Sequence, residues 1–430
     1  MTNESRVTLR GRWWVPASSD TTVPGVLTIL PGRRPRLEVD DRIWPCTFPV
    51  PTPGKPVGIR FEDLLRSTSI IHGQTVDGQA VTLVNAHEIH VGANGVILSA
   101  THALLGAHIP APDAAAFQSL AGHFTHLDEW AATNGFSVTF LPEGGSRIEH
   151  HRPPTITAAL SEEFSFELGW DFEGPTLQTP QTECSITEHA VVQLTATTSA
   201  IFDALLTAFD TMRKFIVLGI GAPVRITMLR ATLPNAKKSV MVYNSLITDD
   251  PPSASLMTHE MLFTFPGIND RLADMLQRWT TKQSLLGPIY NLCVGTIMST
   301  TMFVEHQFTS FFQAIESYHR RTTPAVTSKK RVSANERLTA VIATRNAGWL
   351  FSAPLDAAIK HLVAVRDYFT HYLPHMDQRV PEPADLYNLT IRLRTLLEMV
   401  LLHELGLDDA AIKERITSTR RLERHLVQPA

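Results

Sequence analysis

Hydrophobic residues follow two different periods along the chain. As far as about residue 250, apolar and polar residues alternate in short runs separated by Pro and Gly, which is typical of β-strands. From about residue 265 onward, apolar residues recur every three to four positions, as they do on amphipathic helices. We therefore predict a multidomain α+β protein, in which a β-rich region at 1–250 precedes an all-α helical bundle at 265–430. A break near 150–160 would divide the β-rich region into two subdomains.

Turn residues bound the strands expected in the first region. Asp77-Gly78 stands between two apolar runs and predicts a hairpin over 70–83, because Asp-Gly favours the tight turn that joins antiparallel strands. The apolar spacing of 199–218 predicts one helix within this otherwise β-rich region. The other runs with strand character are 7–14, 23–32, 135–141, 165–170, 190–195, 224–229 and 239–243.

Helical spacing dominates the second region. Asn269 and Asp408 stand where a helix N-cap is expected, since their side chains can accept a hydrogen bond from the first turn. The stretch 322–333 is polar, basic and contains proline, which predicts a loop between two helices. The helices predicted from the apolar spacing are 269–283, 300–321, 334–347, 354–373, 383–406 and 408–417.

Composition narrows the class of protein. The chain has 430 residues, of which 43% are hydrophobic and 19% charged, as in soluble globular proteins. A net charge of -4 gives no overall attraction to nucleic acid, although 301–430 is basic, with 17 Lys+Arg against 14 Asp+Glu. The three cysteines are far apart and predict neither a disulfide framework nor a metal site. No apolar run suits a signal peptide or a membrane span, so we expect a cytoplasmic protein without membrane association.

One predicted helix carries polar residues that suit chemistry at a phosphate. The segment 354–373 has apolar residues at helical spacing, and Arg366, Asp367 and His371 lie towards its end. Arg366 supplies a cation at every pH, and His371 supplies a base that titrates near neutrality. Asp367 and His371 are four residues apart and share one helix face, so the carboxylate can hydrogen-bond the ring and orient it.

Helix geometry predicts a homodimer if this arrangement is catalytic. Arg366 and His371 are about 140° apart around an ideal helix, so one helix alone would hold them awkwardly at a single phosphate. Two copies across a twofold axis would bring two such pairs to one cleft. On spacing alone, a solvated helix end with an incidental Asp–His pair is the alternative.

The same Arg-to-His spacing occurs elsewhere, so context has to decide between the matches. It recurs at Arg66 with His72 and at Arg420 with His425. The first of these pairs lies in the β-rich region, and the second lies in a charged C-terminal tail. Only the pair within 354–373 lies on an amphipathic helix of the predicted bundle.

Metal and nucleotide sites are disfavoured by the sequence. His87-x-x-His90 and His123-x-x-His126 invite a zinc site, but no cysteine or carboxylate stands at a fixed spacing beside either pair. The sequence contains no P-loop, no dinucleotide-binding glycine pattern and no nucleophile elbow. We therefore expect no metal and no cofactor.

Arg366-Asp367-x-x-x-His371, followed by Tyr372, resembles the signature of HEPN ribonucleases, which is an arginine, a polar residue and a histidine a few residues later. More narrowly, the chain resembles the ApeA-like HEPN proteins of bacterial anti-phage defence. Asp367 stands where Asn is common in that family, which leaves the role of the carboxylate open. The N-terminal half carries similar landmarks, which are Gly11-x-Trp13-Trp14-x-Pro16, Pro24-Gly25-x-Leu27, His72-Gly73-x-x-x-Asp77-Gly78-x-x-Val81-Thr82-Leu83, and His123-Phe124 with Leu127-x-x-Trp130.

The resemblance implies a metal-independent endoribonuclease of an abortive-infection system that forms a homodimer through its HEPN domain. His371 would take a proton from a ribose 2′-OH or give one to the leaving 5′-oxygen, and Arg366 would stabilise the charged phosphorane. Asp367 would orient His371. The implied partners are RNA, with transfer RNA as one guess, and a phage-derived trigger. The β-rich region would sense that trigger or hold the nuclease idle.

Further residues are candidates for contact with RNA. Tyr368 and Tyr372 flank the motif and can stack on bases, although core packing is an equal alternative for Tyr368. Glu316, within 300–321, either faces the site or is a surface glutamate, and the sequence favours the surface. The most basic run of the chain is a candidate for phosphate contact and consists of Lys329, Lys330 and Arg331.

Two other functions remain open at this point. One is a catalytically inactive HEPN-fold module that binds RNA or a protein. The other is a β-rich recognition protein whose helical part only dimerises.

Overall fold

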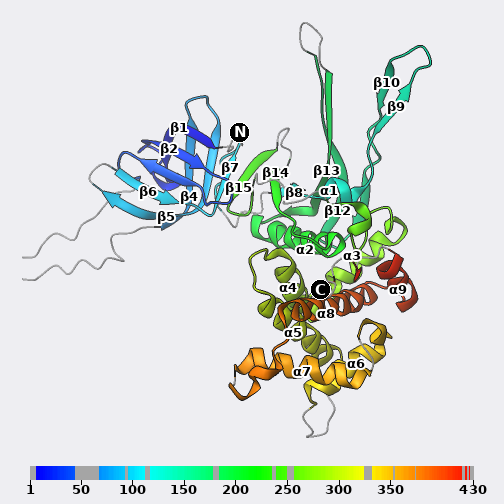
Figure 1. Cartoon of the computed structure of the whole chain (residues 1–430). Coiled ribbons are helices and arrows are strands. Elements are labelled where there is room, and N and C mark those ends of the chain that lie inside the picture. Colours follow the sequence, from blue (N-terminus) through cyan, green and yellow to red (C-terminus); the bar gives the residue numbers. More distant parts are fainter. Residues whose placement is uncertain are drawn as a thin grey trace, which may run out of the picture.

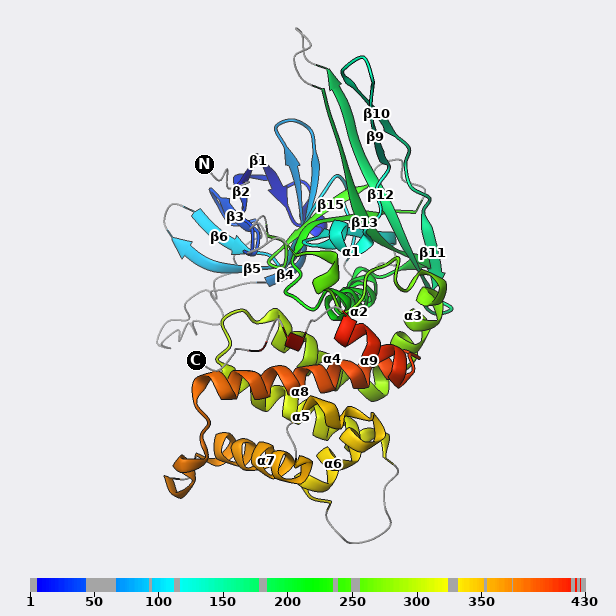
Figure 2. The same cartoon turned by 45° about the vertical axis from the view of Figure 1, so that its right-hand side comes forward.

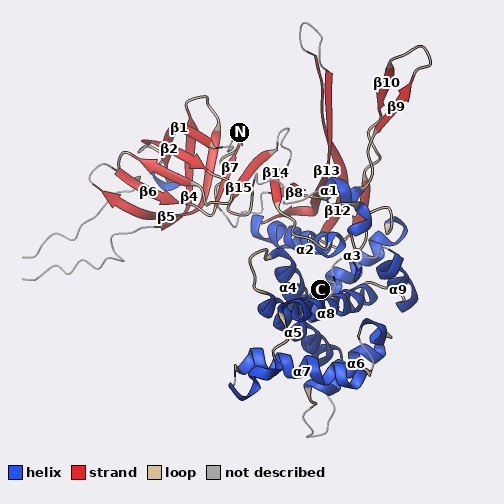
Figure 3. Cartoon of the chain, viewed as in Figure 1, coloured by secondary structure: helices blue, strands red, loops and turns tan. Residues whose placement is uncertain are grey.

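Strands and helices occupy separate halves of the molecule, as the change in hydrophobic period predicts (Figures 1 and 3). In the described part of the chain, β15 (Val240–Asn244) is the last strand, and only helices and loops follow it. The computed structural model describes the chain except for residues 1–5, 44–66, 93–94, 112–116, 178–183, 235–238, 249–255, 324–331, 352–353, 373, 419–421, 424–425 and 427–430.

The first strands close into a small barrel, blue and cyan in Figure 1. They are β1 (Val7–Trp14), β2 (Val23–Ile29), β3 (Arg36–Val39), β4 (Ser67–Thr75), β5 (Ala80–Gly92) and β6 (Gly95–Ser99). Their order is β5-β4-β1-β2-β3-β6, and β6 pairs back to β5, which closes the set. Trp13 is fully buried, and a Cβ on Gly73 would lie 2.2 Å from its ring, so only glycine fits opposite the indole.

An open antiparallel sheet continues from β5 of the barrel. Its strands, in spatial order, are β7 (His102–Leu105), β15, β14 (Ile226–Thr232), β8 (Phe117–Phe124), β13 (Cys184–Ala200), β12 (Phe164–Leu177) and β11 (Ile156–Ala159). The long β12–β13 hairpin extends beyond the body of the protein (Figures 1 and 2). A second hairpin projects beside it and is formed by β9 (Phe136–Phe140) and β10 (Ser146–His150). The short helix α1 (Leu127–Ala131) follows β8.

The protein has two hydrophobic cores, and alternate side chains of the same strands point into one core or the other. On β4 and β5, Ile71 and Leu83 point into the barrel, while their neighbours Ile70 and Val84 belong to the second core. Leu105 is the last buried residue of the barrel core. The division that we expect at 150–160 stays a prediction; this range runs from the end of β10 in the two-stranded sheet through β11 in the large sheet.

The helical half follows the predicted segments, with one addition. Its helices are α3 (Leu272–Thr281), α4 (Gln283–Met298), α5 (Val304–Thr322), α6 (Ala334–Thr344), α7 (Leu355–His371), α8 (Pro383–Glu404) and α9 (Asp409–Ser418). The sequence does not predict α4, because this helix is apolar on most sides and contains Pro288, so no polar face marks its period. Among the described residues, no helix combines the length and the apolar character needed to cross a membrane.

The β-rich and helical halves share one core. Helix α2 (Phe202–Ile220) contacts β8 and β13 of the sheet and also contacts α3 and α4. The second core runs without a break from the sheet through α2 to α8. Polar contacts reinforce the bundle, since Glu404 of α8 binds Lys282 at 2.6 Å and the Tyr318 hydroxyl at 2.7 Å. The helical half is therefore fixed to the sheet rather than tethered to it.

Candidate functional site

Helix α7 positions the polar motif. Its apolar side buries Ile359, Leu362, Val365 and Phe369 in the bundle, where α7 packs against α5 and α6. The helix ends at His371 and is capped by Tyr372, which adopts a left-handed backbone conformation and donates its N–H to the carbonyl of Tyr368. The motif residues therefore lie in the last turns of a helix whose other face is anchored in the core.

Arg366 is held by two carboxylates. Its Nη2 donates to Glu316 Oε2 at 2.6 Å, and its Nη1 donates to Asp367 Oδ1 at 2.6 Å. The guanidinium also lies over the ring of Phe312, 5.4 Å from its centroid. Burial lowers the pKa of Arg366, but the hydrogen bonds and charges of Glu316 and Asp367 outweigh burial and leave that pKa raised. Arg366 is thus a permanent cation in a fixed position.

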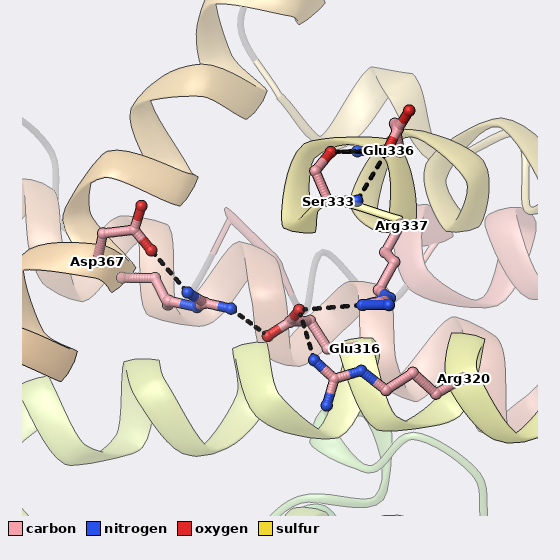
Figure 4. A network of polar contacts seen from close by, with 7 residues as sticks. Glu316, Arg320, Ser333, Glu336, Arg337 and Asp367 are labelled. Atoms are coloured by element: carbon pink, nitrogen blue, oxygen red, sulfur yellow. Dashed lines mark hydrogen bonds and ion pairs between the residues drawn. The ribbon is translucent and has the colours of Figure 1, made fainter. Parts of the chain in front are cut away.

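Glu316 is a buried centre of ion pairs, so the prediction of a surface glutamate is wrong. It is only 7% exposed, on the side of α5 that faces α6 and α7. Besides Arg366, it contacts Arg320 at 3.3 Å and Arg337 at 3.8 Å (Figure 4). A buried carboxylate requires such cations, because an unpaired charge is costly inside a protein. Glu316 therefore joins three helices.

Asp367 and His371 do not form the hydrogen bond that their spacing predicts. Asp367 instead accepts from the adjacent Arg366. A fully charged donor at short range competes well against a histidine ring one turn away. His371 is exposed at the end of α7, and the described residues show no hydrogen bond between it and Asp367. The structure thus assigns the Asp367 carboxylate to Arg366.

The two tyrosines of the motif differ in their surroundings. Tyr372 is 57% exposed, with its ring centroid 5.5 Å from that of Tyr368. Tyr368 is partly buried and packs against the core and Phe369. Burial and the carboxylate of Asp377 raise the pKa of Tyr368, so its hydroxyl stays protonated. Tyr372 is thus the more accessible of the two rings, whereas Tyr368 packs against the core.

The remaining candidates are the basic run, the two other Arg-to-His pairs and the histidine pairs considered for zinc. Lys329, Lys330 and Arg331 lie outside the described residues, as do Arg66 and the pair Arg420 and His425. His123 Nε2 donates to Asp171 Oδ2 at 2.7 Å. The described ranges contain no group of three or more His, Cys, Asp or Glu side chains that could hold a metal.

Sequence reasoning missed Arg320 and Arg337. Arg320 is four residues from Glu316 on α5, so the standard spacing of a helical ion pair gives a signal for it. Arg337 reaches Glu316 from α6, a tertiary contact that no local pattern indicates. Burial and the cation of Arg337 lower the pKa of nearby His319, which keeps that ring neutral around pH 7.

Comparisons with known proteins bear on both halves. A family model described as ApeA N-terminal domain 1 matches residues 8–279. A second model, described as Apea-like HEPN, matches residues 309–411 and so includes Glu316, Arg337, Arg366 and His371. No match to this chain was found among curated proteins or among solved structures.

Proposed function

Because the chain belongs to the ApeA-like HEPN family, we propose that it is an anti-phage nuclease that cuts RNA without a metal ion. HEPN domains are usually nucleases, and they commonly dimerise and act on RNA. One observation carries the proposal most directly. Two carboxylates, Asp367 of α7 and Glu316 of α5, hold Arg366, and the exposed end of α7 carries His371. A fixed cation and an accessible imidazole are the two groups that phosphodiester cleavage by a 2′-OH requires.

The chemistry would proceed by attack of the ribose 2′-oxygen on the adjacent phosphorus. His371 takes the 2′-OH proton as general base or protonates the leaving 5′-oxygen as general acid, and solvent water carries the other proton, so that the proton lost by the 2′-OH matches the one gained by the 5′-oxygen. Arg366 stabilises the negative charge that develops on the phosphorane oxygens. The P–O5′ bond breaks, which leaves a 2′,3′-cyclic phosphate on one fragment and a 5′-OH on the other. DNA lacks the 2′-OH and resists cleavage.

Two copies of the chain would complete the site. On one α7, Arg366 and His371 project about 140° apart, so a second copy is needed to bring an arginine and a histidine to opposite sides of one phosphate. Asp367 serves this site by holding Arg366, to which it is bonded in the structure, rather than by orienting His371. Tyr372 would stack on a base next to the cleaved linkage.

The test is cleavage of labelled RNA by the purified full-length protein in EDTA. Wild type should cut RNA and leave an all-deoxy strand of the same sequence intact. His371→Ala should abolish cleavage, because it removes the proton-transfer group. His361→Ala is the matched control, since His361 is also an exposed histidine of α7, and it should retain activity. Activity that is retained in His371→Ala, or that needs added Mg²⁺, would contradict the proposal.

A catalytically inactive binding module is the second candidate. The observation in its favour is that both terminal nitrogens of Arg366 already bind carboxylates, so the arginine is engaged in the absence of RNA. If this candidate is right, the purified dimer binds RNA but shows no cleavage that depends on His371. The same assay therefore separates the two candidates.

The remaining assignments concern the cellular setting. We infer that the protein acts in the cytoplasm, where RNA and phage products meet, and that transfer RNA is a reasonable first substrate to test. The β-rich region would respond to a phage-derived trigger. The core that it shares with the helical bundle supports this role, because a change at the sheet would bear directly on α2 and the helices behind it.

A further inference from the structure

Three arginines converge on Glu316, and one of them also binds a second carboxylate. Arg320 comes from α5, Arg337 from α6 and Arg366 from α7. Asp367 is the second carboxylate and binds Arg366. The cluster therefore has one more positive charge than negative charges.

The distances show where this excess charge lies. Glu316 Oε2 takes Arg366 at 2.6 Å, which is a strong charge-assisted hydrogen bond. Glu316 Oε1 is shared by Arg320 at 3.3 Å and Arg337 at 3.8 Å, and the second distance is too long for a hydrogen bond. Arg366 is thus satisfied, whereas Arg320 and Arg337 are only loosely neutralised on the other side of the carboxylate.

Arg337 is the most unusual member of the cluster. Its side chain is only 14% exposed, and its Nε is buried without a hydrogen-bond partner among the described residues. A guanidinium carries five N–H donors, and a buried donor without an acceptor costs free energy. Arg320 is 56% exposed and lies at the rim of the same cluster, where a ligand can reach it. Arg320 therefore presents an exposed guanidinium beside the more deeply placed Arg337, and the two share one acceptor oxygen.

We propose that Arg320 and Arg337 bind a phosphate of the RNA strand, next to the phosphate that is cleaved at Arg366 and His371. This inference rests on the proposed function, for which it defines a substrate-binding subsite. The guanidinium fork matches phosphate oxygens, and a phosphate there offsets the one positive charge by which the cluster exceeds its carboxylates. Because Glu316 separates Arg366 from the other two arginines, the subsite takes a flanking phosphate rather than the reacting one.

A purely structural role for these arginines makes a different prediction. If Arg337 only ties α6 to α5, its replacement lowers stability but leaves the electrostatic part of RNA binding unchanged. If it contacts a phosphate, its replacement also changes the salt dependence of binding, because each neutralised phosphate releases counterions. The salt dependence of RNA binding therefore distinguishes phosphate contact from a purely structural role.

The experiment measures binding of a labelled single-stranded RNA of mixed sequence by fluorescence anisotropy over a range of salt concentrations. The full-length protein carries His371→Ala in every case, so that cleavage does not interfere. The variants added to this background are Arg320→Ala and Arg337→Gln. Arg321→Ala is the matched control, because the neighbouring Arg321 donates to the carbonyl of Leu285 instead of joining the cluster.

Each cluster variant should weaken binding about tenfold, which corresponds to the loss of one charge-assisted hydrogen bond. Each should also reduce the slope of log K against log salt by up to about 0.7, the value for the one phosphate that the two arginines share. Arg321→Ala should leave the slope unchanged. An unchanged slope in folded Arg320→Ala and Arg337→Gln, or an equal fall in Arg321→Ala, would overturn the subsite. Should Arg337→Gln fail to fold, the result for the exposed Arg320→Ala decides alone.

Failure of the subsite can be distinguished from failure of the nuclease proposal. The binding slopes are measured without cleavage, so they stand even if the wild-type protein proves unable to cut RNA. Conversely, wild-type cleavage that depends on His371, together with unchanged slopes, would retain the nuclease and remove the subsite.

Discussion

Replacing Glu316 with glutamine removes the carboxylate that holds three arginines together. The side chain is 9% exposed and accepts from Arg366 at 2.6 Å. Removing one partner of a buried ion pair typically costs about 3–5 kcal/mol, because the other charge is left unpaired. Arg366 keeps its bond to Asp367 and is 23% exposed, so water compensates part of the loss. We therefore expect Glu316→Gln to lower the free energy of unfolding by about 2–3 kcal/mol.

Urea unfolding of the full-length protein at pH 7, followed by circular dichroism, measures this loss. Glu305→Gln is the matched control, because Glu305 lies in the first turn of the same helix, where its charge interacts with the helix dipole. That interaction contributes up to about 1 kcal/mol. Inorganic phosphate should restore part of the stability of Glu316→Gln, since an anion can take the place of the carboxylate among the arginines. It should have no comparable effect on Glu305→Gln.

The outcome that would refute this reasoning is a loss below about 0.5 kcal/mol in Glu316→Gln, the range of ordinary surface substitutions. Equal losses in the two variants would refute it as well. Either result would mean that the ion pairs around Glu316 are not a mainstay of the bundle, and that Arg366 does not depend on Glu316 for its position.

Three further predictions concern other parts of the molecule. Burial raises the pKa of Asp171, but hydrogen bonds from a histidine and an arginine outweigh burial and hold that pKa at about 2. Because this pKa is depressed in the folded state, the Asp171 carboxylate stabilises the fold at pH values above the ordinary aspartate pKa, about 4, and this contribution is lost as the pH falls towards 2. The side chain is 28% exposed, so Asp171→Asn should lower the free energy of unfolding by only about 1 kcal/mol at pH 7. Urea unfolding at a series of pH values should show this difference disappear in acid. Gly73→Ala should destabilise the barrel by about 1–3 kcal/mol in thermal unfolding, because the new Cβ overlaps a buried indole. Gly295→Ala is the matched variant: it lies in open space within α4 and should stabilise the protein by up to about 1 kcal/mol. A loss of stability in both variants would contradict this reasoning. Tyr318→Phe removes a 2.7 Å hydrogen bond to the Glu404 carboxylate and should cost about 1.5–3 kcal/mol in urea unfolding; unchanged stability would show that water replaces the hydroxyl.

Local patterns made the helical half largely predictable. The bounds of α7 agree with the apolar spacing to within a few residues, because one face of this helix is buried and the other is polar. The bounds of α8 agree as well, although its residues 395–402 are buried without a break. Helix α4 is the exception, since its nearly uniform apolar surface has no period to detect. The hairpin of β4 and β5 was predictable for the same local reason, through Asp77-Gly78 at its turn.

Long-range pairing was beyond the reach of these patterns. The barrel closes through β3 with β6 and β6 with β5, contacts whose register depends on the whole set of strands. Likewise, β8 lies between β13 and β14, although β13 begins 60 residues after β8 ends. Alternation shows which residues face inward but not which strand is the neighbour.

The candidate site was predictable only in part, for the same reason. Arg366 and His371 stand out because they lie on one amphipathic helix. The partner that Arg366 binds, Glu316, is fifty residues away on another helix, so its burial could not be read from its own surroundings. The spacing of Asp367 and His371 allowed a hydrogen bond, but it could not show that the adjacent arginine takes the carboxylate first.

The most direct measurement of the central claim is the chemistry of the RNA ends that appear when the protein is expressed. Ends that form with wild type and not with His371→Ala should carry a 2′,3′-cyclic phosphate on the upstream fragment and a 5′-OH on the downstream one. Ends with a 3′-OH and a 5′-phosphate, or identical ends in the two proteins, would contradict cleavage by the 2′-oxygen at Arg366 and His371.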